Sequence, residues 1–248
     1  MFKIFKNISF IGLLLLSACG GENTEPYVNE PGAEESAKKD VLERGADVMQ
    51  NKAPINAINV YLDGFHFYNG NMKGQMEAHH FCTVLNEDVT QCIIYDGNVK
   101  DAHIMGVEYI VSEKLFKSLP EDEKKLWHSH NHEVKSGTLI APGIPELAEH
   151  ELMEKLVSTY GKTWHTWHTD QDKELPYGSP QLMMGFTKDG QLEDSLIKKR
   201  DKNFEISTGE KRKNRADIPD HKILPGADSW QDGKVIQLPS LTKHEHKH

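Results

Sequence analysis

The strongest fold signal in the sequence is a β-hairpin. Two stretches rich in strand-forming residues, 76–85 and 89–95, flank a polar turn at 86–88, whose residues Asn, Glu and Asp suit a hairpin loop. In a hairpin centred on the middle of that turn, Cys82 faces Cys92. The fold must therefore contain at least one antiparallel strand pair.

The rest of the chain mixes helical and extended patterns without the regular β–α–β order of a doubly wound sheet. We predict a single α+β domain with a mixed or antiparallel sheet and several helices. The expected helices are 41–52, 113–126 interrupted by Pro120, and 145–160, ending at Gly161; residues 187–217 form a helical or irregular excursion. The expected strands besides the hairpin are 64–68, 103–111, 127–135, 163–169 and 181–186.

The N-terminus has the pattern of a bacterial lipoprotein signal. Lys3 and Lys6 precede an apolar run at 8–16, which is followed by Ser-Ala-Cys ending at Cys19. The run is much shorter than the roughly 20 residues that span a bilayer. We expect cleavage before Cys19 and acylation of its sulfur; the alternative is an ordinary secretory signal with a chance cysteine.

These features predict four segments. They are a signal peptide at 1–18, the lipidated cysteine with a flexible acidic tether at 19–42, a folded domain at 43–241 and a His-rich tail at 242–248. The expected location is the bacterial cell envelope, with the bilayer as a partner through acylated Cys19. Gly20 after the cysteine is compatible with the outer membrane of a Gram-negative cell.

Net charge and cysteine content limit the possible partners of the protein and indicate its redox environment. The formal net charge of −9 argues against nucleic acid as a partner, because phosphate binding needs clustered Lys and Arg. With Cys19 acylated, Cys82 and Cys92 are the remaining thiols. We predict that they form a disulfide, because export usually reaches an oxidising compartment. The alternatives are two buried free thiols, or a reactive Cys82 beside His79 and His80.

Several long runs resemble the oil body-associated protein family of plants, which has fungal and bacterial relatives. The similarity extends over roughly 55–240 and is carried by GFHFYNGNMKGQMEAHHFC (64–82), QCIIYDG (91–97), MGVEYIVSEKLFKSLPEDEKKLWHSH (105–130), EVKSG (133–137), YGKTWHTWHTD (160–170) and LPYGSPQLMMGF (175–186).

The resemblance implies a role in lipid association, because plant members are associated with seed oil bodies and their size and stability. It provides no established catalytic residue to transfer, and plant members lack the lipoprotein signal found here. The expected function is a membrane-anchored, non-enzymatic module that binds lipid, envelope components or protein. The specific lipid or protein partner is not identified by the resemblance.

Histidine is unusually frequent, with 14 residues, and many of them lie in the middle of the chain. Imidazole binds transition metals such as Zn, and alternating histidines on a strand present several ligands together. The candidate metal site combines His128 and His130 with one of His132, His165 or His168, and Asp170 is a further candidate.

The metal hypothesis carries its own alternatives. A metal site of this kind would make the protein a metal-dependent hydrolase or isomerase, or a metal-binding protein. In the competing interpretation, the histidines pack with Trp127, Trp164 and Trp167 in a polar core. The final histidines, His244, His246 and His248, belong to a tail that would bind metal only adventitiously.

Overall fold

A computed structural model describes residues 24–28, 30–171 and 174–239. Cys19, the expected signal peptide and the His-rich tail lie outside these residues. The strands are β1 (Val60–Tyr68), β2 (Asn71–Asn86), β3 (Val89–Tyr95), β4 (Ile104–Val111), β5 (His128–Ser129), β6 (Tyr160–His165) and β7 (Gln181–Met184). The helices are α1 (Ala37–Met49), α2 (Ala53–Asn56), α3 (Glu113–Ser118), α4 (Glu121–Lys124), α5 (Asn131–Ser136), α6 (Glu146–Leu156), α7 (Asp194–Asn203) and α8 (Thr208–Asn214), with a 3-10 turn at Ser229–Asp232.

The strands form one antiparallel sheet that closes on itself. Its order is β4-β3-β2-β1-β7-β6-β5, and β4 also pairs with β6, which completes a ring of six strands with β5 as an addition beside β6. The closing pairs run from Gly106 with His165 to Val111 with Tyr160. The predicted α+β class fits in broad terms, but the sheet dominates the fold.

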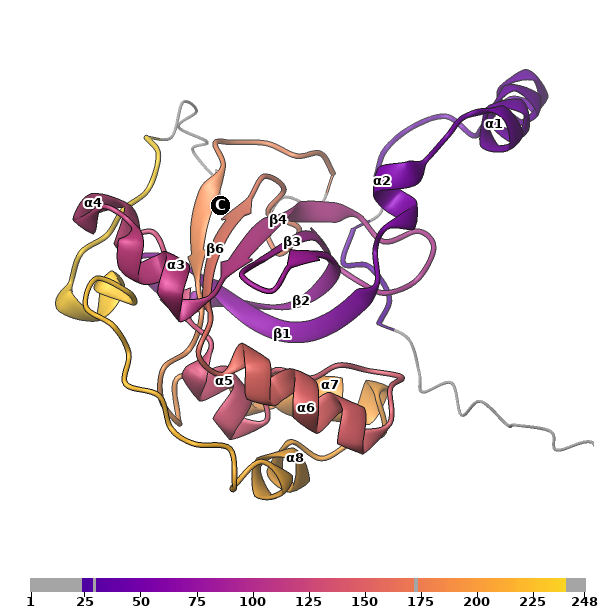
Figure 1. Cartoon of the computed structure of the whole chain (residues 1–248). Helices are drawn as coiled ribbons and strands as arrows, with labels where there is room; N and C mark the ends of the chain where they lie inside the picture. Colours follow the sequence, from indigo (N-terminus) through magenta and orange to yellow (C-terminus); the bar gives the residue numbers. More distant parts are fainter. Residues whose placement is uncertain (1–23, 29, 172–173, 240–248) are drawn as a thin grey trace, which may run out of the picture.

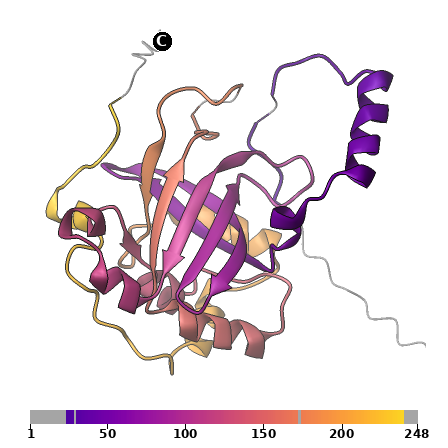
Figure 2. The ribbon, with the colours of Figure 1, turned by 45° about the horizontal axis from the view of Figure 1, so that its top comes forward.

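Helices cover the ring unevenly. Helices α5, α6 and α8 lie together on one side of the sheet, with α7 close to them, whereas α3 and α4 lie at another side (Figure 1). Helix α1 projects away from the body and buries none of its residues (Figure 2). Within the described part of the chain, no helix has the length and apolar character needed to cross a bilayer.

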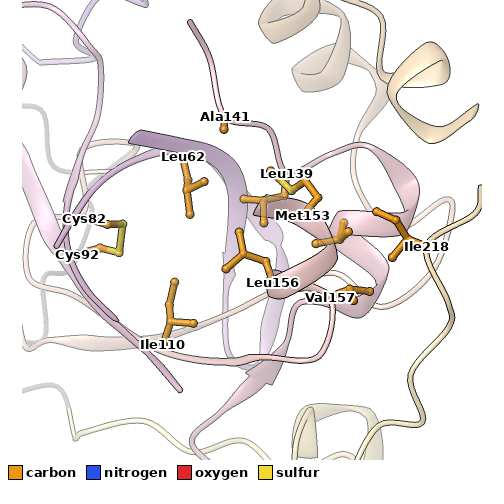
Figure 3. Close-up of a cluster of buried hydrophobic side chains, with 11 residues drawn as sticks. Leu62, Cys82, Cys92, Ile110, Leu139, Ala141, Met153, Leu156, Val157 and Ile218 are labelled. Carbon is orange, nitrogen blue, oxygen red and sulfur yellow. A yellow bond between two sulfur atoms is a disulfide. The ribbon is translucent and has the colours of Figure 1, made fainter. Parts of the chain in front are cut away.

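An apolar cluster fills one part of the ring and continues into α6. Leu62 and Ile110 lie with the Cys82–Cys92 pair, and Leu156 of α6 points toward them (Figure 3). The members from the sheet alternate along their strands with residues that face outward, as the two-residue period of a strand requires. The interior is thus divided between this apolar cluster and a group of polar side chains.

The hairpin forms where the sequence predicts it. Strands β2 and β3 pair so that Cys82 lies opposite Cys92, and the structure joins their sulfur atoms in a disulfide. The two side chains are 0% and 4% exposed, so the bridge lies in the interior. The expected break at Pro120 is also confirmed, because it separates α3 from α4.

The expected strand at 127–135 is wrong. Only His128–Ser129 is extended, and α5 begins directly after His130. The alternation of histidines imitated a strand, but the chain turns into a helix that buries Val134 and ends at Gly137, whose φ of 80° suits a left-handed helix cap. The expected helix at 145–160 is also too long, since α6 ends at Leu156.

The expected tether at 19–42 is not free over its whole length. Thr24 and Val28 are 1% and 2% exposed, and the Thr24 backbone N–H donates to the Asn98 side chain at 2.8 Å. Helix α1 also begins at Ala37, before the expected domain boundary. Acidic composition suggested a solvated segment, but specific hydrogen bonds hold its first described residues against the domain.

We predict that replacing both Cys82 and Cys92 with Ala lowers the free energy of unfolding by about 2–3 kcal/mol, because the short bridge restricts the unfolded chain. Urea unfolding of the variant and the wild type measures this difference. Reducing agent should destabilise the wild type and leave the variant unchanged. Two titratable thiols at these positions in unfolded, non-reduced protein taken directly from the producing cell would contradict the bridge.

Candidate functional site

Imidazoles and carboxylates from most strands gather inside the ring. The strands turn these side chains inward at alternate positions, and none of them is more than 4% exposed. The group consists of His66 from β1, His80 from β2, Glu108 from β4, His128 from β5, His165 from β6, His130 at the start of α5 and Glu133 within α5.

Glu108 is the centre of the group, because each of its carboxylate oxygens faces two histidines. Oε2 lies 2.9 Å from His80 Nε2 and 3.6 Å from His66 Nε2. Oε1 lies 3.1 Å from His130 Nε2 and 3.5 Å from His128 Nε2. One carboxylate therefore has four imidazole nitrogens within 4 Å.

The contact between His80 and Glu108 requires a proton or a cation between the two groups. His80 Nδ1 lies 3.0 Å from the Ala78 carbonyl oxygen, which can only accept a hydrogen bond, so Nδ1 carries a proton. In neutral imidazole the other nitrogen then has a lone pair, and His80 Nε2 would direct it at the carboxylate. Either a proton, carried by His80 or by Glu108, or a cation must lie between these two acceptors.

Burial controls the protonation of the other groups. It lowers the pKa of His128 and His165 to about 3, so both rings are neutral. Burial opposes ionisation of Glu108, but hydrogen bonding with His130 and His80 outweighs it and holds the pKa of that carboxyl well below its usual range. Burial and repulsion by Glu108 raise the pKa of Glu133 well above its usual range. The centre thus combines one carboxylate with the neutral imidazoles of His128 and His165.

His128 has the most available ring in the centre. Among the described residues, neither of its ring nitrogens has a hydrogen-bond partner, although the side chain is completely buried. Buried polar atoms without partners are rare in folded proteins, and each asks for an explanation. His128 also belongs to two groups whose ligand atoms lie within 4.8 Å of one another, one with His66 and Glu108 and the other with His130 and Glu133.

Glycine allows β6 to approach the centre closely. A Cβ atom added at Gly161 would lie 2.1 Å from Glu108 Oε1 and 2.8 Å from His128 Nε2. Any side chain at this position would therefore displace the two groups. The cavity that remains is about 10 Å³, which is close to the volume needed for a single water-sized occupant.

The structure brings together only part of the predicted metal set. His128 and His130 meet at Glu108, and His165 Nε2 lies 3.4 Å from His66 Nδ1. The expectation that His132 shares a face with His128 and His130 is wrong.

His132 lies on α5 and His168 lies in the chain after β6. The helix directs the His132 ring outward, where its side chain is 20% exposed and 3.8 Å from Asp189. His168 Nε2 instead donates to the Ser179 carbonyl oxygen, and Asp170 accepts a hydrogen bond from the Tyr68 hydroxyl. These three candidates do not belong to the groups with ligand spacing found among the described residues.

Sequence reasoning missed His66, His80, Glu108 and Glu133. A usable signal existed for Glu108, because it is the only charged residue of the otherwise apolar strand β4. His66 and His80 lie an even number of residues from Leu62 and Cys82 on the same strands, so they face the interior as those two residues do. Strand alternation could therefore have identified three of the four residues, but not their meeting at one point.

Comparison with known proteins identifies a family and close relatives. The family described as "Protein of unknown function (DUF1264)" matches residues 52–219. Oil body-associated protein 1B of Arabidopsis thaliana is 43% identical over 210 residues, which cover 84% of this chain and 87% of the relative. Oil body-associated protein 1A of Zea mays is 44% identical over 222 residues, covering 87% and 93%. No solved structure matches the chain significantly.

We predict that Gly161→Ala lowers the free energy of unfolding by about 1–3 kcal/mol, because the new methyl group overlaps the Glu108 carboxylate. Gly32→Ala is the matched control, since a Cβ atom there meets no atom within 4 Å. Chemical denaturation followed by circular dichroism measures both variants. Equal stability of the two would show that β6 does not pack against Glu108 as described.

Proposed function

The chain belongs to the oil body-associated protein family, and we propose that it is an envelope lipoprotein whose domain is a metal-binding module. The relatives are named for association with oil bodies. For this chain, the corresponding lipid partner is the bilayer that holds acylated Cys19. The proposed metal is a transition metal ion such as Zn²⁺, bound at Glu108 inside the closed sheet.

The contact between His80 and Glu108 carries the metal proposal. Two acceptors 2.9 Å apart in a buried site need a cation or an additional proton between them, and the other imidazoles offer further lone pairs. Neutral imidazole and carboxylate are standard Zn²⁺ ligands. Glu108 with His66 and His128 is the proposed ligand set, because their ligand atoms lie within 4.8 Å of one another.

Groups around the ligands support the same assignment. A carboxylate that binds a metal is usually contacted by further hydrogen-bonding groups outside the ligand set, and these are themselves held by partners. Two histidines beside Glu108 have such partners: the Ala78 carbonyl for His80, and the Thr159 hydroxyl at 2.8 Å for His130 Nδ1. These partners contact the Nδ1 atoms and hold the Nε2 atoms of both rings toward the Glu108 carboxylate.

The size of the centre favours binding over catalysis. A cavity of about 10 Å³ has room for an ion but not for an organic substrate beside it. A hydrolase or isomerase would need both in contact. We therefore place the metal-binding module ahead of the alternative of a metal-dependent enzyme.

The lipoprotein signal and the packing of Thr24 together describe how the domain is held. Only four residues separate Cys19 from Thr24, which is buried against the domain. A fully extended chain between these two positions reaches at most about 18 Å. Acylation of Cys19 would therefore hold the domain close to the bilayer surface, in the outer membrane of a Gram-negative cell.

We predict that full-length protein with His244, His246 and His248 replaced by Gln retains bound metal after dialysis against Zn²⁺-free buffer. Glu108→Gln should lose this ion, because the substitution removes the anionic ligand with little change of shape. Elemental analysis measures the metal content. The exposed Glu87→Gln is the matched control and should keep it. If the wild type binds none of Zn, Cu, Ni and Fe after reconstitution, the histidines are structural.

Anchoring has a separate test in the cell that produces the protein. Wild-type protein should pellet with membranes, dissolve in detergent and incorporate labelled palmitate, because Cys19 is acylated. Cys19→Ser should leave the membrane fraction and lose the label. A variant that still pellets without aggregating would show that the lipoprotein assignment is wrong.

A further inference from the structure

A second buried polar cluster lies on the opposite face of β1 and β2 from the Glu108 centre. Asp63 in β1 alternates with Leu62 and Gly64, which line the interior cavity, and therefore points outward. Glu77 and His79 do the same in β2, where His80 is the inward neighbour. All three outward side chains are at most 1% exposed.

Two atoms of this cluster have no hydrogen-bond partner among the described residues: Asp63 Oδ2 and His79 Nε2. Both are directed into the cluster. His79 Nδ1 lies 3.1 Å from Asp63 Oδ2, and His79 Nε2 lies 3.7 Å from Glu77 Oε1. The ligand atoms of Asp63, Glu77 and His79 lie within 4.8 Å of one another.

The positive charge in the cluster does not match its two carboxylates. Arg200 of α7 is fully buried, and its Nη1 donates to Asp63 Oδ1 at 3.0 Å. Glu77 has no buried cation paired with it in the described chain. A buried unpaired charge is costly, and a bound cation or proton removes it.

We propose that Asp63, Glu77 and His79 bind a second divalent metal ion, separate from the one at Glu108. Two carboxylates and one imidazole form a ligand set suited to Zn²⁺ or Mn²⁺. Arg200 and Tyr61 contact the ligands from outside the proposed metal site and hold them in place. Arg200 holds the second oxygen of Asp63, and the Tyr61 hydroxyl lies 2.8 Å from His79 Nδ1. Such outer contacts orient metal ligands in known sites.

The N-terminal segment closes this second site. The Thr24 hydroxyl donates to Glu77 Oε1 at 3.3 Å and accepts from Asn203 Nδ2 at 3.1 Å, which links the segment to α7. A Cβ atom at Gly97 would lie 2.5 Å from the Thr24 carbonyl oxygen, so glycine permits this close approach. An ion held there would be enclosed by the segment between the anchor and the sheet.

Metal stoichiometry tests the proposal in the full-length chain carrying Gln in place of the three tail histidines. After loading with Zn²⁺, or with Mn²⁺ in a parallel sample, and exhaustive dialysis, elemental analysis should find two ions per chain. Glu77→Gln should retain one, Glu108→Gln should retain one, and the combined variant none. The exposed Glu87→Gln controls for loss of one acidic group and should retain two.

The outcomes separate the two sites. A wild type that saturates at one ion, lost in Glu108→Gln, overturns the second site and leaves the proposed function intact. Two ions in Glu77→Gln also overturn it. One ion that survives Glu108→Gln and disappears in Glu77→Gln supports the second site while the Glu108 centre fails. If Glu77→Gln does not fold, the metal content of Glu108→Gln decides the question. One retained ion supports the second site, and no retained ion overturns it.

Discussion

The burial of the Glu108 carboxylate is the constraint on which the interior of this protein depends. A charge that is 2% exposed must be compensated where it lies, since removing it from water is expensive. The compensation comes from imidazoles on separate strands. Each of these strands must therefore place a specific side chain at the level of Glu108 along the ring. Glycine at 161 is part of the same requirement, because β6 could not otherwise come so close.

Closure of the sheet makes this arrangement possible. Pairing of β4 with β6 places Ile110 opposite Gly161 and Glu108 opposite Thr163. The same strand β6 carries β5, so His128 reaches the carboxylate from a segment with only two extended residues. An open sheet would leave Glu108 on a solvated face. The apolar cluster around Leu62 then isolates the polar group from the side of α6.

Local sequence patterns predicted part of the local structure, and they carried no information on contacts between distant strands. The hairpin, its facing cysteines and the break at Pro120 depend on neighbouring residues, so they could be predicted. The meeting of His66, His80 and Glu108 depends on strand pairing across the whole ring, for which no local pattern exists. His132 was misplaced because the run of alternating histidines crosses an element boundary. His128 lies in a strand, His130 directly precedes α5, and His132 lies within that short helix.

The attachment of the N-terminal segment has a mechanical consequence. Tension that reaches the described chain at its first residue, Thr24, acts on the hydrogen bonds of Thr24 to Asn98, Glu77 and Asn203. They are loaded before the rungs of the antiparallel sheet and break in succession rather than together. Under tension, the N-terminal segment therefore detaches from the domain first. Its detachment lengthens the link to the point of pulling, while the sheet stays folded.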